Sequence, residues 1–131
     1  MRRTPIIAGL GFLAIAALAQ TAGTARPLKP EQEALVKPAG KPESCIPLSQ
    51  IRETRVRDDQ TIDFYMSGRK VYRNRLPNSC PRLGFEEKFA YKTSLSELCS
   101  VDIITVLTSP GISRGASCGL GPFQPVTGVP R

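Results

Sequence analysis

The chain has 131 residues, with 18 lysines and arginines against 11 acidic residues, and it contains no histidine. This length suits one domain and excludes a multidomain enzyme. Without histidine, the chain can form neither a serine–histidine triad nor a histidine metal site. Its apolar fraction of 40% is ordinary for a globular protein and argues against wholesale disorder.

The first 25 residues have the pattern of a secretory signal peptide. Residues 1–3 are a basic head, and residues 6–19 are uncharged and rich in alanine, leucine and isoleucine. This apolar run is shorter than the ~20 residues that span a bilayer. Small residues allow cleavage after Ala19 or after Ala25. We therefore predict a signal peptide over residues 1–25 and an exported product, periplasmic or secreted, without a transmembrane segment.

The next segment, residues 26–44, has the composition of a linker. It contains four prolines among lysines and glutamates and almost no large apolar side chains. Such a segment buries too little apolar surface to offset the entropy lost on ordering, so we predict a flexible tether. The folded domain is then expected to span residues 45–131.

All four cysteines fall within residues 45–131. An even number of cysteines in a small exported domain predicts two disulfides. The chain has no C-x-x-C pair and no histidine to complete a zinc site, so we predict neither a metal site nor a cofactor. Three pairings are possible, and we favour Cys80 with Cys99 and Cys45 with Cys118.

The apolar pattern of the domain is mostly that of strands. Residues 61–66 alternate with period two, and turn-forming residues flank them. The predicted elements are a meander of strands at 52–57, 61–66 and 70–76, a short strand at 89–91, a helical turn at 94–98, a buried strand at 101–108, a loop at 110–115 and a last, edge strand at 118–126. We therefore predict a mainly β fold with little helix, a small antiparallel meander curled into a barrel or sandwich and stapled by disulfides.

Several short runs carry a resemblance to a known family. They are CIPLSQI at 45–51, DQTI at 59–62, YRNRL at 72–76, CPRLGF at 80–85, LCSVD at 98–102 and CGLGPF at 118–123. In these runs the chain resembles a family of small exported bacterial proteins, of Gram-negative type, that carry a cysteine-containing domain of unknown function. The resemblance covers residues 45–126. It implies a cell-envelope setting and a single cysteine-stapled domain, and it supplies no catalytic residue.

The window from residue 51 to residue 75 is the most basic part of the chain. Five of its arginines are candidates for binding an anionic ligand: Arg52, Arg55, Arg57, Arg73 and Arg75. If they share a sheet face, their planar guanidinium groups suit bidentate capture of phosphate or carboxylate. The alternative, which we favour, is a solvated strand face on which these arginines pair with nearby acids.

The acidic residues fit structural roles better than catalytic ones. Adjacent carboxylates along a turn or strand point in different directions, so Asp58 and Asp59 are expected to cap a turn. The Glu86–Glu87 pair is expected to be ordinary surface charge. Asp102 can accept backbone N–H bonds or pair with an arginine, and we favour a buried pair with Arg73.

These observations favour an uncharacterised, non-enzymatic binding or structural module of the periplasm. Its expected partner is an envelope protein or an anionic glycan, and we expect a monomer that does not bind nucleic acid. The first alternative is a binder of phosphate- or carboxylate-bearing ligands that uses the five arginines. A further alternative is a small hydrolase or a protease inhibitor, the latter acting through the exposed loop at residues 108–117.

Overall fold

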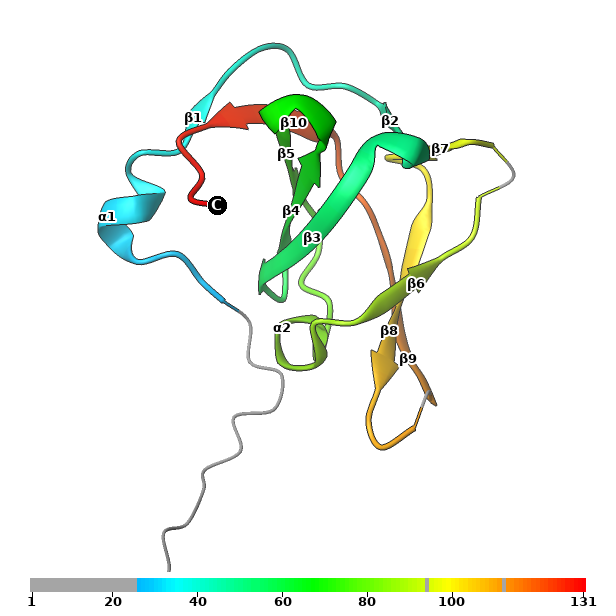
Figure 1. Cartoon of the computed structure of the whole chain (residues 1–131). Helices are drawn as coiled ribbons and strands as arrows, with labels where there is room; N and C mark the ends of the chain where they lie inside the picture. Colours follow the sequence, from blue (N-terminus) through cyan, green and yellow to red (C-terminus); the bar gives the residue numbers. More distant parts are fainter. Residues whose placement is uncertain (1–25, 94, 112) are drawn as a thin grey trace, which may run out of the picture.

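The computed structural model describes residues 26–93, 95–111 and 113–131. The predicted signal peptide lies outside these residues. Among the helices of the described ranges, none is both long enough and apolar enough to cross a membrane. The fold is mainly β, as predicted, and all its strand pairs are antiparallel (Figure 1).

A five-stranded sheet forms one side of the molecule. Its strands, in spatial order, are β1 (Lys37–Pro38), β10 (Phe123–Thr127), β5 (Val71–Arg75), β4 (Thr61–Met66) and β3 (Ile51–Asp58). The predicted meander is confirmed, since β3, β4 and β5 are consecutive neighbours joined by tight connections. One of these connections is the 3-10 turn Ser67–Arg69. All six residues of β4 are buried, because both faces of the sheet are covered at its centre.

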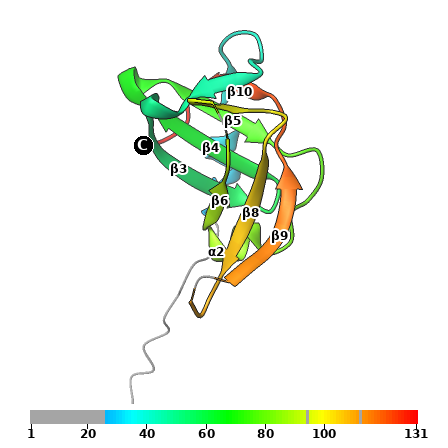
Figure 2. The same ribbon diagram turned by 90° about the vertical axis from the view of Figure 1, so that its right-hand side faces the viewer.

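Two smaller sheets lie beside the large one. The first pairs β2 (Cys45–Pro47) with β7 (Glu97–Cys99), and the second has the order β6 (Phe89–Tyr91), β8 (Ile103–Thr108) and β9 (Ser113–Gly119). Short helical turns complete the fold: α1 (Pro30–Glu33), α2 (Leu83–Glu86) and a 3-10 turn at Leu48–Gln50. Figures 1 and 2 show an open, layered arrangement that is not closed into a barrel.

One apolar core joins the three sheets. Ile62 and Phe64 project into it from β4, Ile46 from β2 and Ile104 from β8, and each is fully buried. The rings of Phe64 and Phe123 meet edge to face with centroids 5.5 Å apart, a favoured aromatic geometry. The opposite face of the large sheet is covered by the N-terminal segment and the C-terminal tail, which Figure 1 shows on the α1 side.

The disulfides are Cys45–Cys99 and Cys80–Cys118. Two disulfides were predicted correctly, but the favoured pairing was wrong. Cys45 and Cys99 are direct cross-strand partners in the β2–β7 ladder, with Cα atoms 4.0 Å apart. Cys118 lies on β9, where it reaches the segment after β5 that carries Cys80. The pairing depends on which strands become neighbours, and cysteine spacing does not reveal that.

The segment 26–44, predicted to be a tether, is docked on the large sheet. The N–H of Arg26 donates to the carbonyl of Val56, the N–H of Ala39 donates to Pro125, and Glu43 exchanges two hydrogen bonds with Phe123. Strand β1 therefore covers β10, which is not an edge strand as expected. The folded unit begins before Cys45, because backbone pairing compensates for the segment's few apolar side chains.

Two further expectations in the second half of the chain differ from the structure. Part of the helical turn predicted at 94–98 is strand β7, because the chain pairs with β2 there, and Ser94 lies outside the described residues. The loop expected at 108–117 belongs mostly to the β8–β9 hairpin, with β9 starting at Ser113. The strand predicted at 101–108 is confirmed from Ile103 on, and Val101 is exposed.

Candidate anion-binding site

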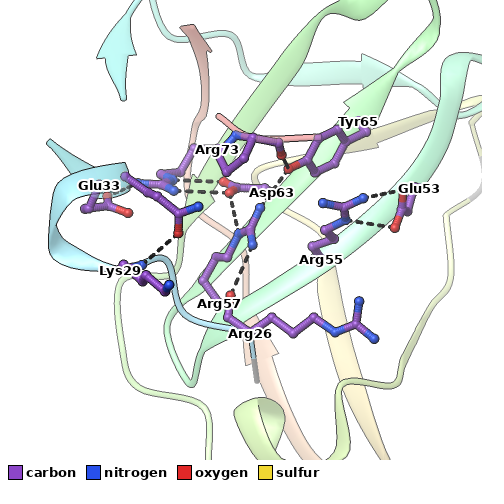
Figure 3. A network of polar contacts seen from close by, with 11 residues as sticks. Arg26, Lys29, Glu33, Glu53, Arg55, Arg57, Asp63, Tyr65 and Arg73 are labelled. Atoms are coloured by element: carbon purple, nitrogen blue, oxygen red, sulfur yellow. Dashed lines mark hydrogen bonds and ion pairs between the residues drawn. The ribbon is translucent and has the colours of Figure 1, made fainter. Parts of the chain in front are cut away.

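Arginines and acids gather on the face of the large sheet that points away from the core (Figure 3). Asp63 on β4 lies opposite Arg55 on β3 and Arg73 on β5. Because side chains alternate along a strand, the burial of Ile62 and Phe64 in the core directs Asp63 to the other face. Arg55 and Arg73 therefore lie on the same sheet face as Asp63, which was the condition for a shared binding surface.

Asp63 is fully buried and binds two of the five predicted arginines. Its Oδ2 accepts from Arg57 Nε at 2.9 Å, and its Oδ1 accepts from Arg73 Nε at 2.8 Å. Arg73 also donates to Glu33, which comes from α1. Burial alone lowers the pKa of Arg73, but hydrogen bonds to Asp63 and Glu33 outweigh it and raise the pKa. Arg57 and Arg73 are thus occupied by carboxylates of the protein itself.

The same network fastens both ends of the described chain to the sheet. Arg57 donates to the carbonyl of Arg26 at 3.1 Å and to the hydroxyl of Tyr65 at 2.7 Å. The Tyr65 hydroxyl in turn donates to the carbonyl of Pro130 at 2.7 Å. Burial raises the pKa of Tyr65, so its hydroxyl keeps its proton and its donor role at neutral pH.

The other acids have structural partners, not all of them the expected ones. Asp58 accepts the N–H of Gln60, which confirms its capping role. Asp102 accepts the N–H of Cys99 at 2.7 Å, so the favoured pair with Arg73 is wrong. It could not form, because Arg73 lies on the outer face of the large sheet and already binds Asp63 and Glu33.

Glu86, expected at the surface, is buried. It accepts from Arg82 at 2.8 Å and from the N–H of Ser109 at 3.3 Å. The hydrogen bond from Arg82 holds the pKa of Glu86 below its ordinary value. Glu86 is buried because α2 packs against β3 and β8, a tertiary contact that its position in the sequence does not reveal.

A third predicted residue, Arg75, is not among the arginines that bind Asp63. It is exposed at the end of β5 and, together with Arg57, lines an open cleft of about 610 Å³ near Phe85. Two carboxylates, those of Asp58 and Asp59, also line that cleft and reduce its attraction for an anion. The five predicted arginines therefore do not form a single patch.

The remaining two, Arg52 and Arg55, line a hollow of about 470 Å³ at the start of β3. Two arginines that were not among the predicted site residues complete it: Arg69 and Arg131. Arg69 lies in the basic window at residues 51–75, so its charge could have marked it as a candidate for the site. Arg131 is far from that window, and no local pattern connects it with this site.

Three local features bring these arginines together. A β-bulge between Ile51 and Glu53 interrupts the β3–β4 ladder at Arg52, and bulges commonly redirect a side chain at functional sites. The turn after β4 holds Arg69 in the left-handed region at φ 67°, which is uncommon for a residue with a side chain. Finally, the hydrogen bond from Tyr65 to Pro130 places Arg131 next to the hollow.

The hollow carries an excess of positive charge. Among its described lining residues, Glu53 alone is acidic, and Arg55 donates to it at 2.9 and 3.3 Å and lies over the ring of Tyr65 at 4.7 Å. The hydrogen bond from Arg55 lowers the pKa of Glu53. Arg52, Arg69 and Arg131 form no ion pair with any acidic residue, all 11 of which lie in the described part of the chain.

A possible metal-ligand group elsewhere has a simpler explanation. The ligand atoms of Cys45, Glu97 and Cys99 lie within 4.8 Å of one another. The two sulfurs are joined in a disulfide, and a metal would require them as free thiolates. These three residues therefore belong to the disulfide-linked pair of strands β2 and β7.

Comparisons with known proteins found no relative of this chain. No family model matches the chain, and neither a curated protein nor a solved structure shows significant similarity to it.

Proposed function

We propose that this protein is an exported, non-enzymatic module that binds a phosphate- or carboxylate-bearing ligand of the cell envelope. The binding site is the hollow lined by Arg52, Arg55, Arg69 and Arg131. The observation that carries the proposal is the convergence there of three arginines without acidic partners beside one neutralised Arg55–Glu53 pair. Even if the carboxyl group of Arg131 is counted as charged, the hollow keeps an excess of two positive charges.

Arginine suits this task for a physical reason. Its planar guanidinium group presents a fork of donors that matches two oxygens of a phosphate or carboxylate, and such charge-assisted bonds are stronger than neutral ones. Tyr65 also lines the hollow. A ligand with several anionic groups can engage arginines that lie too far apart for a single small anion to bridge.

The two disulfides support the proposed setting. Together they connect β2 with β7 and the segment after β5 with β9, and the described residues contain no free cysteine. Structural disulfides persist mainly in oxidising compartments such as the bacterial periplasm or the cell exterior. This agrees with the signal peptide predicted from the sequence.

Isothermal titration calorimetry with tripolyphosphate and with tetragalacturonate tests the binding proposal. We expect saturable binding that weakens as salt is added. Combining Arg52→Ala with Arg69→Ala should reduce the affinity at least about tenfold, because each lost charge-assisted bond is worth ~1.5–3 kcal/mol before solvent screening.

The matched control is Arg75→Ala, which removes an exposed arginine outside the hollow and should leave the affinity unchanged. The proposal fails if neither ligand binds the native protein, or if the control weakens binding as much as the double variant does.

The proposed export is tested separately, by the intact mass of the protein from its native host before and after reduction and alkylation. We expect a chain that begins at Gln20 or Arg26 and gains four alkyl groups only after reduction. A full-length chain with four free thiols would refute export, whatever the result of the calorimetry.

A further inference from the structure

A second surface feature lies on the β6–β8–β9 sheet, away from the arginine hollow. The side chains of Ile103, Thr105 and Leu107 alternate with the core residues Ile104 and Val106 along β8. They therefore point to the outer face of this sheet, which is turned toward the viewer in Figure 2. A groove of about 370 Å³ runs along that face.

Apolar side chains on this face are exposed to an unusual degree. Val101 is 86% exposed and Ile103 57%, and both line the groove together with Leu107. Tyr91, which is 37% exposed, also lines the groove from β6, although its cross-strand partner Ile104 faces the core. A contiguous exposed apolar strip on a small protein commonly marks an interaction surface. Within the described residues, the strip has no covering element.

A cation lies at each end of the strip. Arg114 on β9 is the cross-strand partner of Leu107, and Lys92 comes one residue after Tyr91, whose partner on β8 is Ile104. Both cations line the groove, and neither forms an ion pair with an acid in the described part of the chain. Asp102, the acid that lines the groove, is already bound to the N–H of Cys99.

The spacing of these groups indicates the shape of the partner. Ile103 and Leu107 are four residues apart on one strand, which corresponds to ~13 Å at the rise of an extended chain. The groove is open, so a small apolar molecule in it would stay half in water. A polypeptide segment instead covers the apolar strip with its own backbone and side chains.

We propose that this groove binds an extended segment of a partner protein that carries apolar residues at alternate positions and acidic residues at both ends. Its apolar side chains lie over Ile103 and Leu107, and its carboxylates meet Arg114 and Lys92. A second copy of this chain is disfavoured, because a symmetric contact would bring the same cations face to face. This inference is independent of anion binding in the arginine hollow.

Selection from a phage-displayed library of random nonapeptides, on the disulfide-bonded protein, tests the proposal. We expect enriched peptides to have alternating apolar residues flanked by aspartate or glutamate. Their affinity should fall about tenfold or more in Ile103→Asp and in Arg114→Glu, since each substitution replaces an attractive contact with a repulsive or polar one. Both residues are exposed, so these variants should fold normally.

The matched control is the double variant Arg52→Ala plus Arg69→Ala, which alters the other surface and should bind the selected peptides as the native protein does. The proposal is overturned if no peptide prefers the native protein to Ile103→Asp, or if the enriched peptides lack acidic residues. It is also overturned if sedimentation shows a dimer that Ile103→Asp dissociates, since a second copy would then occupy the groove.

Discussion

Two groups of arginines on one sheet face have opposite surroundings. Arg57 and Arg73 lie at the centre of the face, where they share the buried carboxylate of Asp63. Arg52 and Arg69 lie at its end, exposed and without an acidic partner. Residue type and strand position do not separate the two groups, since Arg52 and Arg57 belong to the same strand. The two groups differ because Asp63 lies within hydrogen-bond distance of Arg57 and Arg73 only.

The comparison shows how a basic surface can be divided between stability and binding. At the centre, the ion pairs hold the N-terminal segment and the C-terminal tail against the sheet. At the end, the fixed tail adds Arg131 to the hollow through the hydrogen bond from Tyr65 to Pro130. Central variants should therefore change mainly stability, and those at the end mainly binding.

The largest effect is expected for Asp63→Asn. It leaves Arg57 and Arg73 without the buried carboxylate that both require, and breaking a buried ion pair costs ~3–5 kcal/mol. Urea denaturation followed by circular dichroism should show this loss in the free energy of unfolding. The exposed variant Arg52→Ala is the control, expected to change that free energy by less than ~0.5 kcal/mol. If both variants lose the same small free energy of unfolding, the central arginines do not serve stability more than those at the end of the sheet.

A smaller effect is expected for Tyr65→Phe, which keeps the ring and removes the hydroxyl. The variant loses the hydrogen bond to Pro130 and leaves a donor of Arg57 unsatisfied, which costs ~1–3 kcal/mol. Anion binding should also weaken, because Arg131 is no longer held beside the hollow. Unchanged affinity for tripolyphosphate would show that Arg131 does not contribute to binding.

The smallest effect on stability is expected for Glu53→Gln, since this carboxylate is half exposed and exposed ion pairs contribute less than ~1 kcal/mol. The same substitution should strengthen ligand binding although it slightly lowers stability. Removing the negative charge frees Arg55 for the ligand, so the affinity for tripolyphosphate should rise. A fall in affinity would mean that Glu53 positions Arg55 for binding rather than competing with the ligand.

Lowering the pH should have the same effect on the native protein as Glu53→Gln, because protonation also removes the negative charge of Glu53. Because the hydrogen bond from Arg55 lowers the pKa of Glu53 from 4.5, the folded state is stabilised by this pair above that value. The stabilisation is lost as the pH falls through the lower, folded-state pKa. The ratio of the affinities of native protein and Glu53→Gln should therefore approach one in acid, with ligand protonation cancelling in the ratio.

Local patterns predicted the meander but not the strands that pair over long distances along the chain. The alternation in residues 61–66 and the flanking turns sufficed for the β3–β4–β5 meander, because neighbouring strands joined by tight turns are a local feature. The pairing of Cys45 with Cys99 spans 54 residues and depends on the β2–β7 ladder. The docking of residues 26–44 likewise depends on backbone partners in β10 that composition does not reveal.

The candidate site was predictable only in part, for the same reason. Arg52 and Arg55 belong to a basic window that is visible in the sequence, whereas Arg131 reaches them through a hydrogen bond between residues 65 positions apart. Pairing of the arginines with nearby acids was the favoured alternative, but the sequence does not show that Arg57 and Arg73 are the two that share one buried acid. Excluding Arg57 and Arg73 from the binding site requires knowing that Asp63 on β4 lies between β3 and β5.

The most direct test is to follow the arginine Nε–Hε signals by NMR while tripolyphosphate is added to the native protein. We predict that the signals of Arg52, Arg69 and Arg131 shift together and saturate, while those of Arg57 and Arg73 stay in place. Shifts spread evenly over exposed cations such as Arg75, or confined to the arginines bound to Asp63, would contradict a binding site in the hollow.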